Sequence, residues 1–223
     1  MLERKNSKRN LDDPVIYIVD DDISMRESLT DLFRSMNLPA EAFASPEEFL
    51  GQAEMSRAGC IVLDVRLPGV SGLDFQGQLE RAGSQMPIIF MTGYGDISMS
   101  VRAMKAGAVD FLSKPFRDQD LLDAVLSAIE RDGVRRREQQ RHRGITTRYE
   151  TLTAREKEVL EAVIAGLMNK QIAFQLGISE ITVKLHRGNV MRKMEAKSVA
   201  ELVRSMEQSR EHLARISQTG PSA

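Results

Sequence analysis

Cysteine, histidine and long apolar runs are scarce in this chain of 223 residues. The single cysteine, Cys60, excludes an intramolecular disulfide framework, which fits a reducing compartment. The chain has three histidines and no cluster of zinc ligands around them, which argues against a zinc site. No stretch approaches the roughly 18 consecutive apolar residues of a membrane span, and residues 1–10 lack the apolar core of a signal peptide. We therefore expect a cytoplasmic protein with no membrane partner.

Charge is divided unequally along the chain, although the formal net charge is only −1. Residues 1–130 contain 13 Lys and Arg against 21 Asp and Glu, whereas residues 131–223 contain 18 against 11. The length exceeds that of a usual single domain, so we predict two domains, one acidic and one basic. The basic half indicates a polyanion as partner, and a solvated basic surface is the alternative.

Short apolar runs alternate with helical patterns through the first half. These runs are typical of buried parallel strands. They lie at Val15–Val19, Ala40–Ala44, Cys60–Leu63, Met86–Met91 and Val109–Leu112. Alternating strands and helices imply right-handed crossovers, and five such units suit a doubly wound α/β, flavodoxin-like sheet with the strand order 2-1-3-4-5.

Polar residues stand where four of these runs end. Asp20 and Asp21 follow the first run, Asp64 the third, Thr92 the fourth and Lys114 the fifth. The carboxyl ends of parallel strands open on one edge of the sheet, where this architecture places its ligands. Each residue also has a structural interpretation, as a helix cap, a turn residue or a surface charge. Together they would require five coincidences, so we expect them to converge on one site.

Clustered carboxylates repel one another unless a cation lies among them. A hard, oxygen-seeking ion such as Mg²⁺, or Mn²⁺ in its place, matches this ligand set. Asp64 can act as a nucleophile toward a phosphoryl group, while the metal and Lys114 neutralise charge on the transferring oxygens. Thr92 would donate a hydrogen bond to one of those oxygens. The site therefore predicts metal-dependent phosphoryl transfer.

Residues of about 14–130 resemble the receiver domain of bacterial two-component response regulators, the CheY-like fold. The motifs that carry the resemblance are Val-Asp-Asp-Asp, Leu-Asp-Val-Arg-Leu-Pro-Gly-Val-Ser-Gly, Met-Thr-Gly-Tyr-Gly-Asp and Lys-Ala-Gly-Ala-Val-Asp-Phe-Leu-Ser-Lys-Pro-Phe. The resemblance implies that Asp64 is the phospho-acceptor. It also implies that Asp20, Asp21, Asp64 and the main-chain carbonyl of Arg66 are the metal ligands.

The same resemblance implies a conformational switch. Thr92 would move toward the phosphate, and Phe111 would turn inward behind it. The surface made by helix 4, strand 5 and helix 5 would then change shape. Four residues are expected near that surface, namely Val101, Arg102, Met104 and Lys105.

The second half has the pattern of a small all-α domain of four helices. Thr153–Glu156 is a capping box that begins the first helix. A short helix over Asn169–Leu176 is followed by the turn Gly177–Ser179 and by a helix from Glu180 to about Met194, and a fourth helix begins at Ser198. Two helices joined by so short a turn form a helix-turn-helix.

In a helix-turn-helix the second helix of the pair enters the major groove of DNA. Taking Ile181, Val190 and Met194 as its buried side leaves a more exposed set. This set of candidate DNA contacts comprises Thr182, Lys184, His186, Arg187, Asn189 and Lys193. Lys and Asn can meet base edges, and Thr, Arg and Lys can also anchor phosphates. For His186 a packing role is the alternative.

Residues of about 149–208 resemble the LuxR-type helix-turn-helix domain. The motifs are Leu-Thr-Ala-Arg-Glu-Lys-Glu-Val-Leu, Gly-Leu-Met-Asn-Lys-Gln-Ile-Ala, Leu-Gly-Ile-Ser-Glu-Ile-Thr-Val-Lys and His-Arg-Gly-Asn-Val-Met-Arg-Lys-Met. A receiver joined to this domain resembles a response regulator of the FixJ/NarL family, close to FixJ and StyR-like regulators. The resemblance implies a transcription regulator rather than an enzyme. Its partners would be a sensor histidine kinase, promoter DNA, a second phosphorylated copy and RNA polymerase.

Three segments complete the predicted organisation. They are a mobile leader over residues 1–13, a helical linker over 131–148 and a flexible tail over 209–223, and the last receiver helix is expected to end near Gly144. Two other functions compete with this interpretation. A Mg²⁺-dependent phosphatase would need a substrate-binding insertion, which the short loops do not offer. A phosphate-independent DNA binder with a vestigial receiver is disfavoured by the complete set of site residues.

Overall fold

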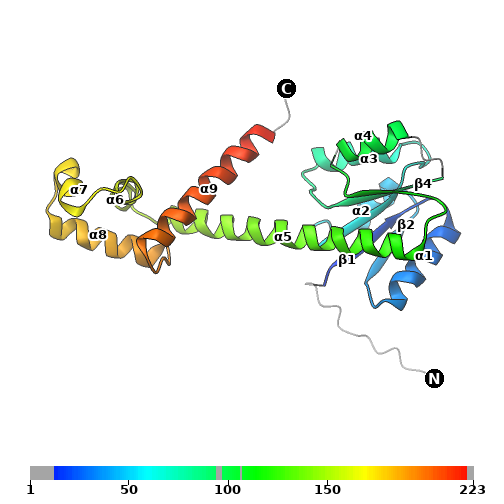
Figure 1. The fold of residues 1–223 in the computed structure, drawn as a ribbon, viewed down its shortest axis with the longest axis horizontal. Coiled ribbons are helices and arrows are strands. Elements are labelled where there is room, and N and C mark those ends of the chain that lie inside the picture. The colour runs from blue at the N-terminus through cyan, green and yellow to red at the C-terminus, as the bar shows by residue number, and fades with distance from the viewer. Residues whose placement is uncertain (1–12, 94–96, 106, 220–223) are drawn as a thin grey trace, which may run out of the picture. The chain divides into compact units, whose positions relative to one another are not determined.

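A computed structural model describes residues 13–93, 97–105 and 107–219 (Figure 1). The chain divides into two compact units, Met1–Arg136 and Arg137–Ala223, which are described separately. None of the described helices is long and apolar enough to cross a membrane. The first unit contains β1 (Val15–Val19), α1 (Ile23–Ser35), β2 (Ala40–Phe43), α2 (Pro46–Gln52), β3 (Gly59–Asp64), α3 (Gly72–Arg81), β4 (Ile88–Thr92), α4 (Ile97–Lys105), β5 (Asp110–Ser113) and the start of α5 (Asp118–Glu150).

The strands of the first unit form one parallel sheet in the order β2-β1-β3-β4-β5. This confirms the predicted fold class and strand order. Residues of β1 alternate between two cores, as the pleat requires. Tyr17 packs with Phe49 of α2 and Phe75 of α3 on one face, whereas Ile18 packs with Phe33 of α1 on the other. Burial on both faces explains why the strands are continuous apolar runs.

The helix that follows β1 begins at a side-chain cap. Asp22 accepts hydrogen bonds from the main-chain N–H groups of Ser24 (2.8 Å) and Met25 (3.4 Å). These groups have no partner within the helix, so the cap satisfies them. Because Asp22 caps the helix, the carboxylates of Asp20 and Asp21 are not needed as helix caps.

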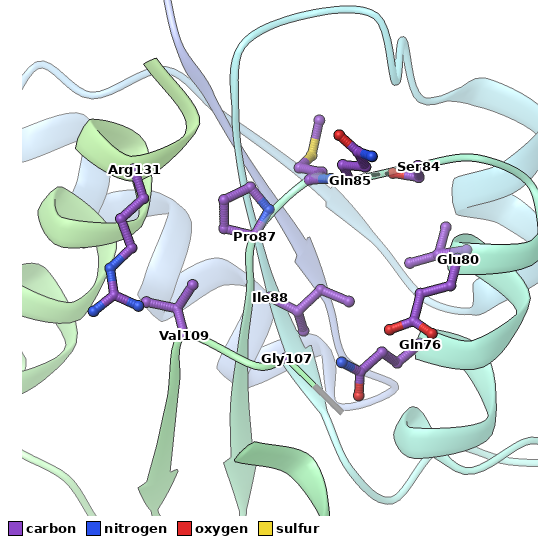
Figure 2. Close-up of a pocket in the computed structure, with 11 residues that line it drawn as sticks. Gln76, Glu80, Ser84, Gln85, Pro87, Ile88, Gly107, Val109 and Arg131 are labelled. Atoms are coloured by element: carbon purple, nitrogen blue, oxygen red, sulfur yellow. Dashed lines mark hydrogen bonds between the residues drawn. The ribbon is translucent and has the colours of Figure 1, made fainter. Parts of the chain in front are cut away.

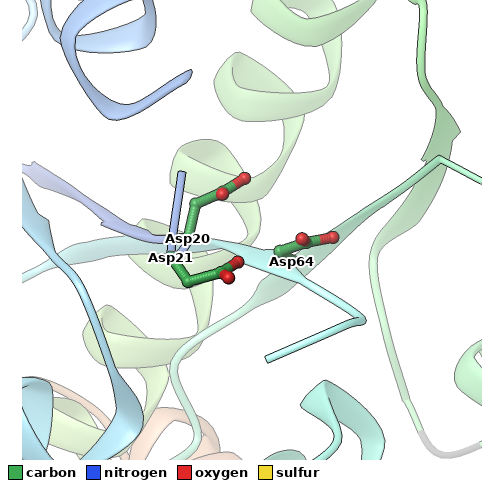
Figure 3. A group of neighbouring side chains, drawn as sticks. All are labelled: Asp20, Asp21 and Asp64. Carbon is green, nitrogen blue, oxygen red and sulfur yellow. The ribbon is translucent and has the colours of Figure 1, made fainter. Parts of the chain in front are cut away.

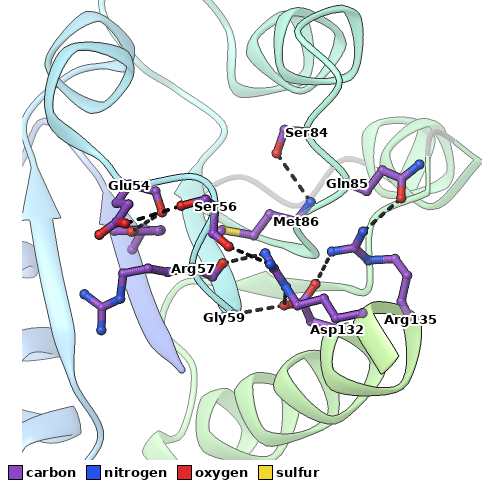
Figure 4. A network of polar contacts seen from close by, with 11 residues as sticks. Glu54, Ser56, Arg57, Gly59, Ser84, Gln85, Met86, Asp132 and Arg135 are labelled. Carbon is purple, nitrogen blue, oxygen red and sulfur yellow. Dashed lines mark hydrogen bonds and ion pairs between the residues drawn. The ribbon is translucent and has the colours of Figure 1, made fainter. Parts of the chain in front are cut away.

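A polar network lies where α5 passes the N-terminal end of β3 (Figure 4). Both carboxylate oxygens of Asp132 accept hydrogen bonds: Oδ2 from the main-chain N–H of Gly59 (3.0 Å) and from Nε of Arg136 (2.6 Å), and Oδ1 from Arg135. Arg136 also donates to the main-chain carbonyl of Ser56 at 2.6 Å. We call these groups the Asp132 network. It ties α5, up to the end of the first unit, to the loop before β3.

Helix α5 runs to Glu150, so the prediction that it ends near Gly144 is wrong. A glycine inside a helix costs about 1 kcal/mol relative to alanine. Ile145, directly after Gly144, is buried in the core of the second unit, and Tyr149 packs against the same core. Burial of a residue as large as Ile145 stabilises by about 1.5–3 kcal/mol and outweighs the cost of the glycine.

The second unit contains α6 (Ala154–Ile164), α7 (Asn169–Leu176), α8 (Glu180–Lys193) and α9 (Val199–Thr219). The predicted capping box is present, with Thr153 and Glu156 each accepting the main-chain N–H of the other. Gly177 ends α7 in the left-handed region (φ 65°), which turns the chain sharply into α8. Helix α9 continues to Thr219, past the point at which the sequence predicts a flexible tail to begin.

Candidate functional site

Three carboxylates meet at the carboxyl edge of the sheet (Figure 3). Asp20 and Asp21 follow β1, and Asp64 is the last residue of β3, the strand that pairs with β1. Each offers a carboxylate oxygen, and these oxygens all lie within 4.8 Å of one another. Asp20 and Asp64 are buried, and Asp21 is exposed. A compact group of oxygen ligands that includes an exposed member suits a divalent cation of the Mg²⁺ type.

The neighbours of Asp20 hold it in place. Its Oδ1 accepts the main-chain N–H of Asp22 (2.9 Å), and its Oδ2 accepts Nζ of Lys114 (2.7 Å). Nη1 of Arg26, on α1, donates to the main-chain carbonyl of Asp20 at 2.7 Å. Groups from α1 and from the end of β5 therefore fix the position of this carboxylate.

Asp64 differs from Asp20 in having an unused oxygen. Its Oδ1 is buried and accepts no hydrogen bond within the described part of the chain, while its Oδ2 lies 3.5 Å from Nζ of Lys114. Burial raises the pKa of Asp64 above its ordinary value; the ammonium of Lys114 and the main-chain N–H of Arg66 oppose this effect, and the carboxylate of Asp20 adds to it. A buried carboxylate oxygen without a partner is costly. Such an oxygen is also free to form a new bond.

Thr92 and Lys114 complete the group of residues at this edge. Thr92 is buried at the end of β4, opposite Ser113 of β5. The main-chain N–H of Lys114 donates to the carbonyl of Thr92 at 2.6 Å. The structure thus brings together all five strand-end residues that the sequence selects.

The residues proposed for the switch and for the surface it changes lie on β4, β5 and α4. Phe111 of β5 is half-buried, and its ring centroid lies 6.4 Å from that of Phe90 in β4. Val101 and Met104 of α4 are apolar but 45% and 48% exposed. Arg66 lies two residues beyond Asp64 and has an exposed side chain. The roles given to these residues stay predictions.

A different hollow, with a volume of about 320 Å³, lies beside the N-terminal end of β4 (Figure 2). Its charged residues, Glu80 of α3 and Arg131 of α5, lie on opposite sides of it. They do not form a reactive group, so the carboxylate cluster is the candidate site for chemistry.

In the second unit, the predicted buried side of α8 is confirmed at Val190 and Met194 and is wrong at Ile181. Val183 and Val190 of α8 and the following residue, Met194, are buried. Ile181 is 79% exposed, so its prediction as a buried residue is wrong. The apolar side of α8 passes through Val183 instead, two residues further along. Ile181 lies nine residues before Val190, which is about 180° around the helix axis, so the two side chains lie on opposite sides of α8.

The candidate DNA contacts on α8 divide into two groups. Lys184 is exposed, whereas the other five are half-buried. Thr182 belongs to the cap of α8, where its hydroxyl lies 2.8 Å from Oγ of Ser179. Nη1 of Arg187 donates to Oδ1 of Asn169 on α7 at 2.7 Å.

Lys193 is also engaged inside the unit. Its Nζ donates to Oε2 of Glu156 (2.6 Å) and to the main-chain carbonyl of Thr151 (3.0 Å). The hydrogen bonds from Lys193 and from the main chain of Thr153 lower the pKa of Glu156. His186 has a buried Nδ1 that finds no partner among the residues described, and Asn189 is half-buried. Of the six candidates, only Lys184 is exposed; the DNA roles of all six stay predictions.

Comparisons with known proteins assign both units. Residues 16–126 match the response regulator receiver domain, and residues 150–206 match the luxR family of bacterial regulatory proteins. The chain belongs to the response regulators. Nodulation protein W of Bradyrhizobium diazoefficiens is 56% identical over 193 residues, which cover 86% of this chain and 85% of the relative. Response regulator protein TodT of Pseudomonas putida is 48% identical, with 89% and 88% covered.

A solved structure supports the same assignment. The structure of the response regulator StyR has a TM-score of 0.82 and 45% sequence identity, and the match covers 88% of this chain and 99% of StyR. This response regulator therefore combines a receiver domain with a LuxR-type DNA-binding domain, close to the FixJ and TodT transcriptional regulators.

Two contacts in this response regulator were not predicted from its sequence. Arg26 holds the main chain of Asp20, and no motif in the sequence marks this role. The sequence marks Glu156 as a capping residue but not as the partner of Lys193. The available signal is the acidic side chain of the capping box, because an acid that becomes buried favours a cationic partner as well as an N–H group.

Proposed function

We propose that Asp64 of the receiver accepts a phosphoryl group from a sensor histidine kinase, and that this modification controls promoter binding by α8. The observation that supports the proposal is the buried carboxylate of Asp64, whose Oδ1 accepts no hydrogen bond from the described residues and whose Oδ2 lies 3.5 Å from Nζ of Lys114. In the reaction this oxygen forms a bond to phosphorus while the bond from phosphorus to the nitrogen of the donor histidine breaks. The leaving imidazole retains the electron pair and takes up a proton.

The residues around Asp64 have separate tasks in this proposal. Lys114 is anchored to Asp20 by a 2.7 Å hydrogen bond and offers positive charge to the transferring oxygens. The Thr92 hydroxyl donates a hydrogen bond to the bound phosphoryl group. Mg²⁺, held by Asp20, Asp21, Asp64 and the carbonyl of Arg66, would neutralise charge on the phosphoryl oxygens. Mn²⁺ has the same preference for oxygen ligands and can replace it.

The signal would leave the receiver through α4, β5 and α5. Thr92 and Phe111 move when the phosphoryl group adds charge at the carboxyl edge. Val101 and Met104 supply exposed apolar area on α4 for contact with a second phosphorylated copy. Two copies joined in this way present two DNA-binding domains, which raises the effective concentration of the second domain at an operator. RNA polymerase would be the further partner at the promoter.

This proposal excludes catalytic turnover of outside substrates. The receiver would catalyse only its own phosphorylation and dephosphorylation. Release of more than one equivalent of phosphate from small phosphoesters would favour a phosphatase instead. Equal DNA affinity of the wild type and Asp64→Asn in the presence of a phosphodonor would favour a phosphate-independent DNA binder.

The first experiment compares the intact mass of the wild type and of Asp64→Asn after incubation with Mg²⁺ and a small acyl phosphate. We expect one added phosphoryl group on the wild type and none on the variant. Asp74→Asn, which changes an exposed aspartate at the start of α3, is the matched control and should be phosphorylated like the wild type. Phosphorylation of Asp64→Asn to the same extent as the wild type would refute the assignment of Asp64.

A further inference from the structure

The exposed face of α8 carries two large apolar side chains. Ile181 is 79% exposed and Leu185 is 64% exposed, and Lys184 between them is exposed as well. Gly188 and Arg192 continue the same face with further steps of three and four residues. This side of the helix is turned away from the buried Val183 and Val190. We call these five positions the exposed face of α8.

Neither apolar side chain on this face has a structural task in the folded domain. Their neighbours on the buried side already fill the core, and both side chains lose little contact with water on folding. Two large apolar residues one turn apart form a contiguous strip, because residues four apart on a helix are surface neighbours. An exposed apolar strip of this kind marks a binding surface.

The charges around this strip indicate which partner covers it. Lys184 and Arg192 lie on the same face, and residues 131–223 carry 18 Lys and Arg against 11 Asp and Glu. A polyanion is therefore favoured over an apolar protein surface. The face also belongs to the second helix of the helix-turn-helix, which enters the major groove. There the only apolar group that a base pair presents is the C5-methyl group of thymine.

Gly188 adds a reason for close approach. It lies one turn beyond Leu185, and a Cβ atom at this position would meet nothing within 4 Å. Packing inside the domain therefore does not require glycine here, although glycine costs helix stability. The missing side chain leaves room for the helix to approach the bases.

We propose that Ile181 and Leu185 contact thymine methyl groups in the major groove and thereby determine which operator sequences the protein prefers. Lys184, between them, supplies the charged contact to a base edge or a phosphate. This inference rests on the proposed function as a DNA-binding regulator, and it assigns base specificity to residues outside the set that the sequence selects. It predicts an operator with thymines at positions that lie beneath the strip.

The experiment uses the full chain with Mg²⁺ and beryllofluoride, which imitates the phosphoryl group. A preferred operator is first selected from a pool of random duplexes. Each thymine in it is then replaced by deoxyuridine, which removes the C5-methyl group and leaves base pairing unchanged. We expect the wild type to lose about four-fold in affinity at each methyl group that it contacts, as expected for one buried carbon. Leu185→Ala and Ile181→Ala should each abolish this loss at a different position.

Phe174→Ala is the matched control, because Phe174 is apolar and 92% exposed but lies on α7. It should keep the full deoxyuridine penalty at every position, whatever its overall affinity. The inference is overturned if no deoxyuridine weakens binding of the wild type, or if both α8 variants retain the penalties. Failure to select any operator would refute the proposed function itself, together with this inference. A selected operator that lacks methyl dependence would leave the proposed function standing and refute the inference alone.

Discussion

Asp64 and Asp132 are buried aspartates that interact with opposite ends of the same strand, and their partners differ. Asp64 ends β3, and its Oδ1 is buried without a hydrogen-bond partner among the described residues. Asp132 lies on α5 and accepts the N–H of Gly59, the residue at which β3 begins. Both oxygens of Asp132 accept hydrogen bonds, and two guanidinium groups neutralise its charge.

The difference separates a structural acid from a reactive one. Burial of a carboxylate costs several kcal/mol unless charges and hydrogen bonds compensate it. At Asp132 the compensation is complete, so this residue can contribute to folding. At Asp64 the described residues engage one oxygen and leave the other for a ligand. A buried acid with an unused oxygen is therefore the better candidate for chemistry.

The chain is closely packed at Gly59, the first residue of β3, which donates its N–H to Asp132. Its φ is 150°, and a Cβ atom there would lie 1.8 Å from the main-chain carbonyl oxygen of Val15. No residue with a side chain fits that space. The N–H that Asp132 binds is therefore presented by a position that only glycine can occupy.

The largest expected effect comes from removing Asp132. Asp132→Ala leaves Arg135 and Arg136 without their buried partner and should lower the unfolding free energy of the receiver by about 3–5 kcal/mol.

Cys60 provides a receiver-specific measurement, because it is the single cysteine, it is fully buried, and burial raises its pKa to about 12. Its rate of thiol labelling in increasing urea reports unfolding of this domain. Asp123→Ala, an exposed change on the same helix, should cost no more than about 0.5 kcal/mol. Equal labelling of both variants would contradict the role of the Asp132 network.

In the DNA-binding domain, Glu156 is a buried acid that is compensated like Asp132, and the expected effect of removing its partner is smaller. Lys193→Met removes two hydrogen bonds and leaves Glu156 without its cation, which should cost about 1.5–3 kcal/mol of stability. Hydrogen exchange of the α6 and α8 amides would measure this loss. Lys184→Met is the matched control on the exposed face. It should leave exchange unchanged but weaken DNA binding, and the reverse pattern would show that the two lysines have been assigned the wrong way round.

The smallest expected effect concerns the stability of Asp64→Asn. Neutralising a buried, partly compensated carboxylate should leave the unfolding free energy unchanged or raise it by about 1 kcal/mol. Lys114 keeps its 2.7 Å hydrogen bond to Asp20 in this variant, so that charge stays paired. The same Cys60 labelling in urea measures the change. A loss as large as that of Asp132→Ala would show that Asp64 is a structural acid like Asp132.

Much of the receiver could be predicted from its sequence. The strand order was correct, and the strand-end residues Asp20, Asp21, Asp64, Thr92 and Lys114 lie together as expected. The prediction succeeded because a residue just past a parallel strand has one place to go, the carboxyl edge of the sheet. An error of one or two residues in a strand boundary does not move the residue away from that edge.

The helical parts were less predictable. Gly144 resembled a helix end, but the burial of Ile145 carries α5 through it. Ile181 was expected in the core and is exposed, whereas Lys193 was expected on the surface and is bonded to Glu156. A helix turns by about 100° for each residue, so a small error in the assumed buried face exchanges inside and outside.

The sequence by itself determined the two domains, the order of the strands and the cluster of acids, because these follow from apolar periodicity and from the common edge of parallel strands. Only the tertiary structure decided that Ile181 of α8 meets solvent, which lysine of that helix is already paired, and which buried acid has an oxygen without a partner among the described residues. These properties depend on contacts between residues far apart in the chain, and neither periodicity nor spacing encodes such contacts.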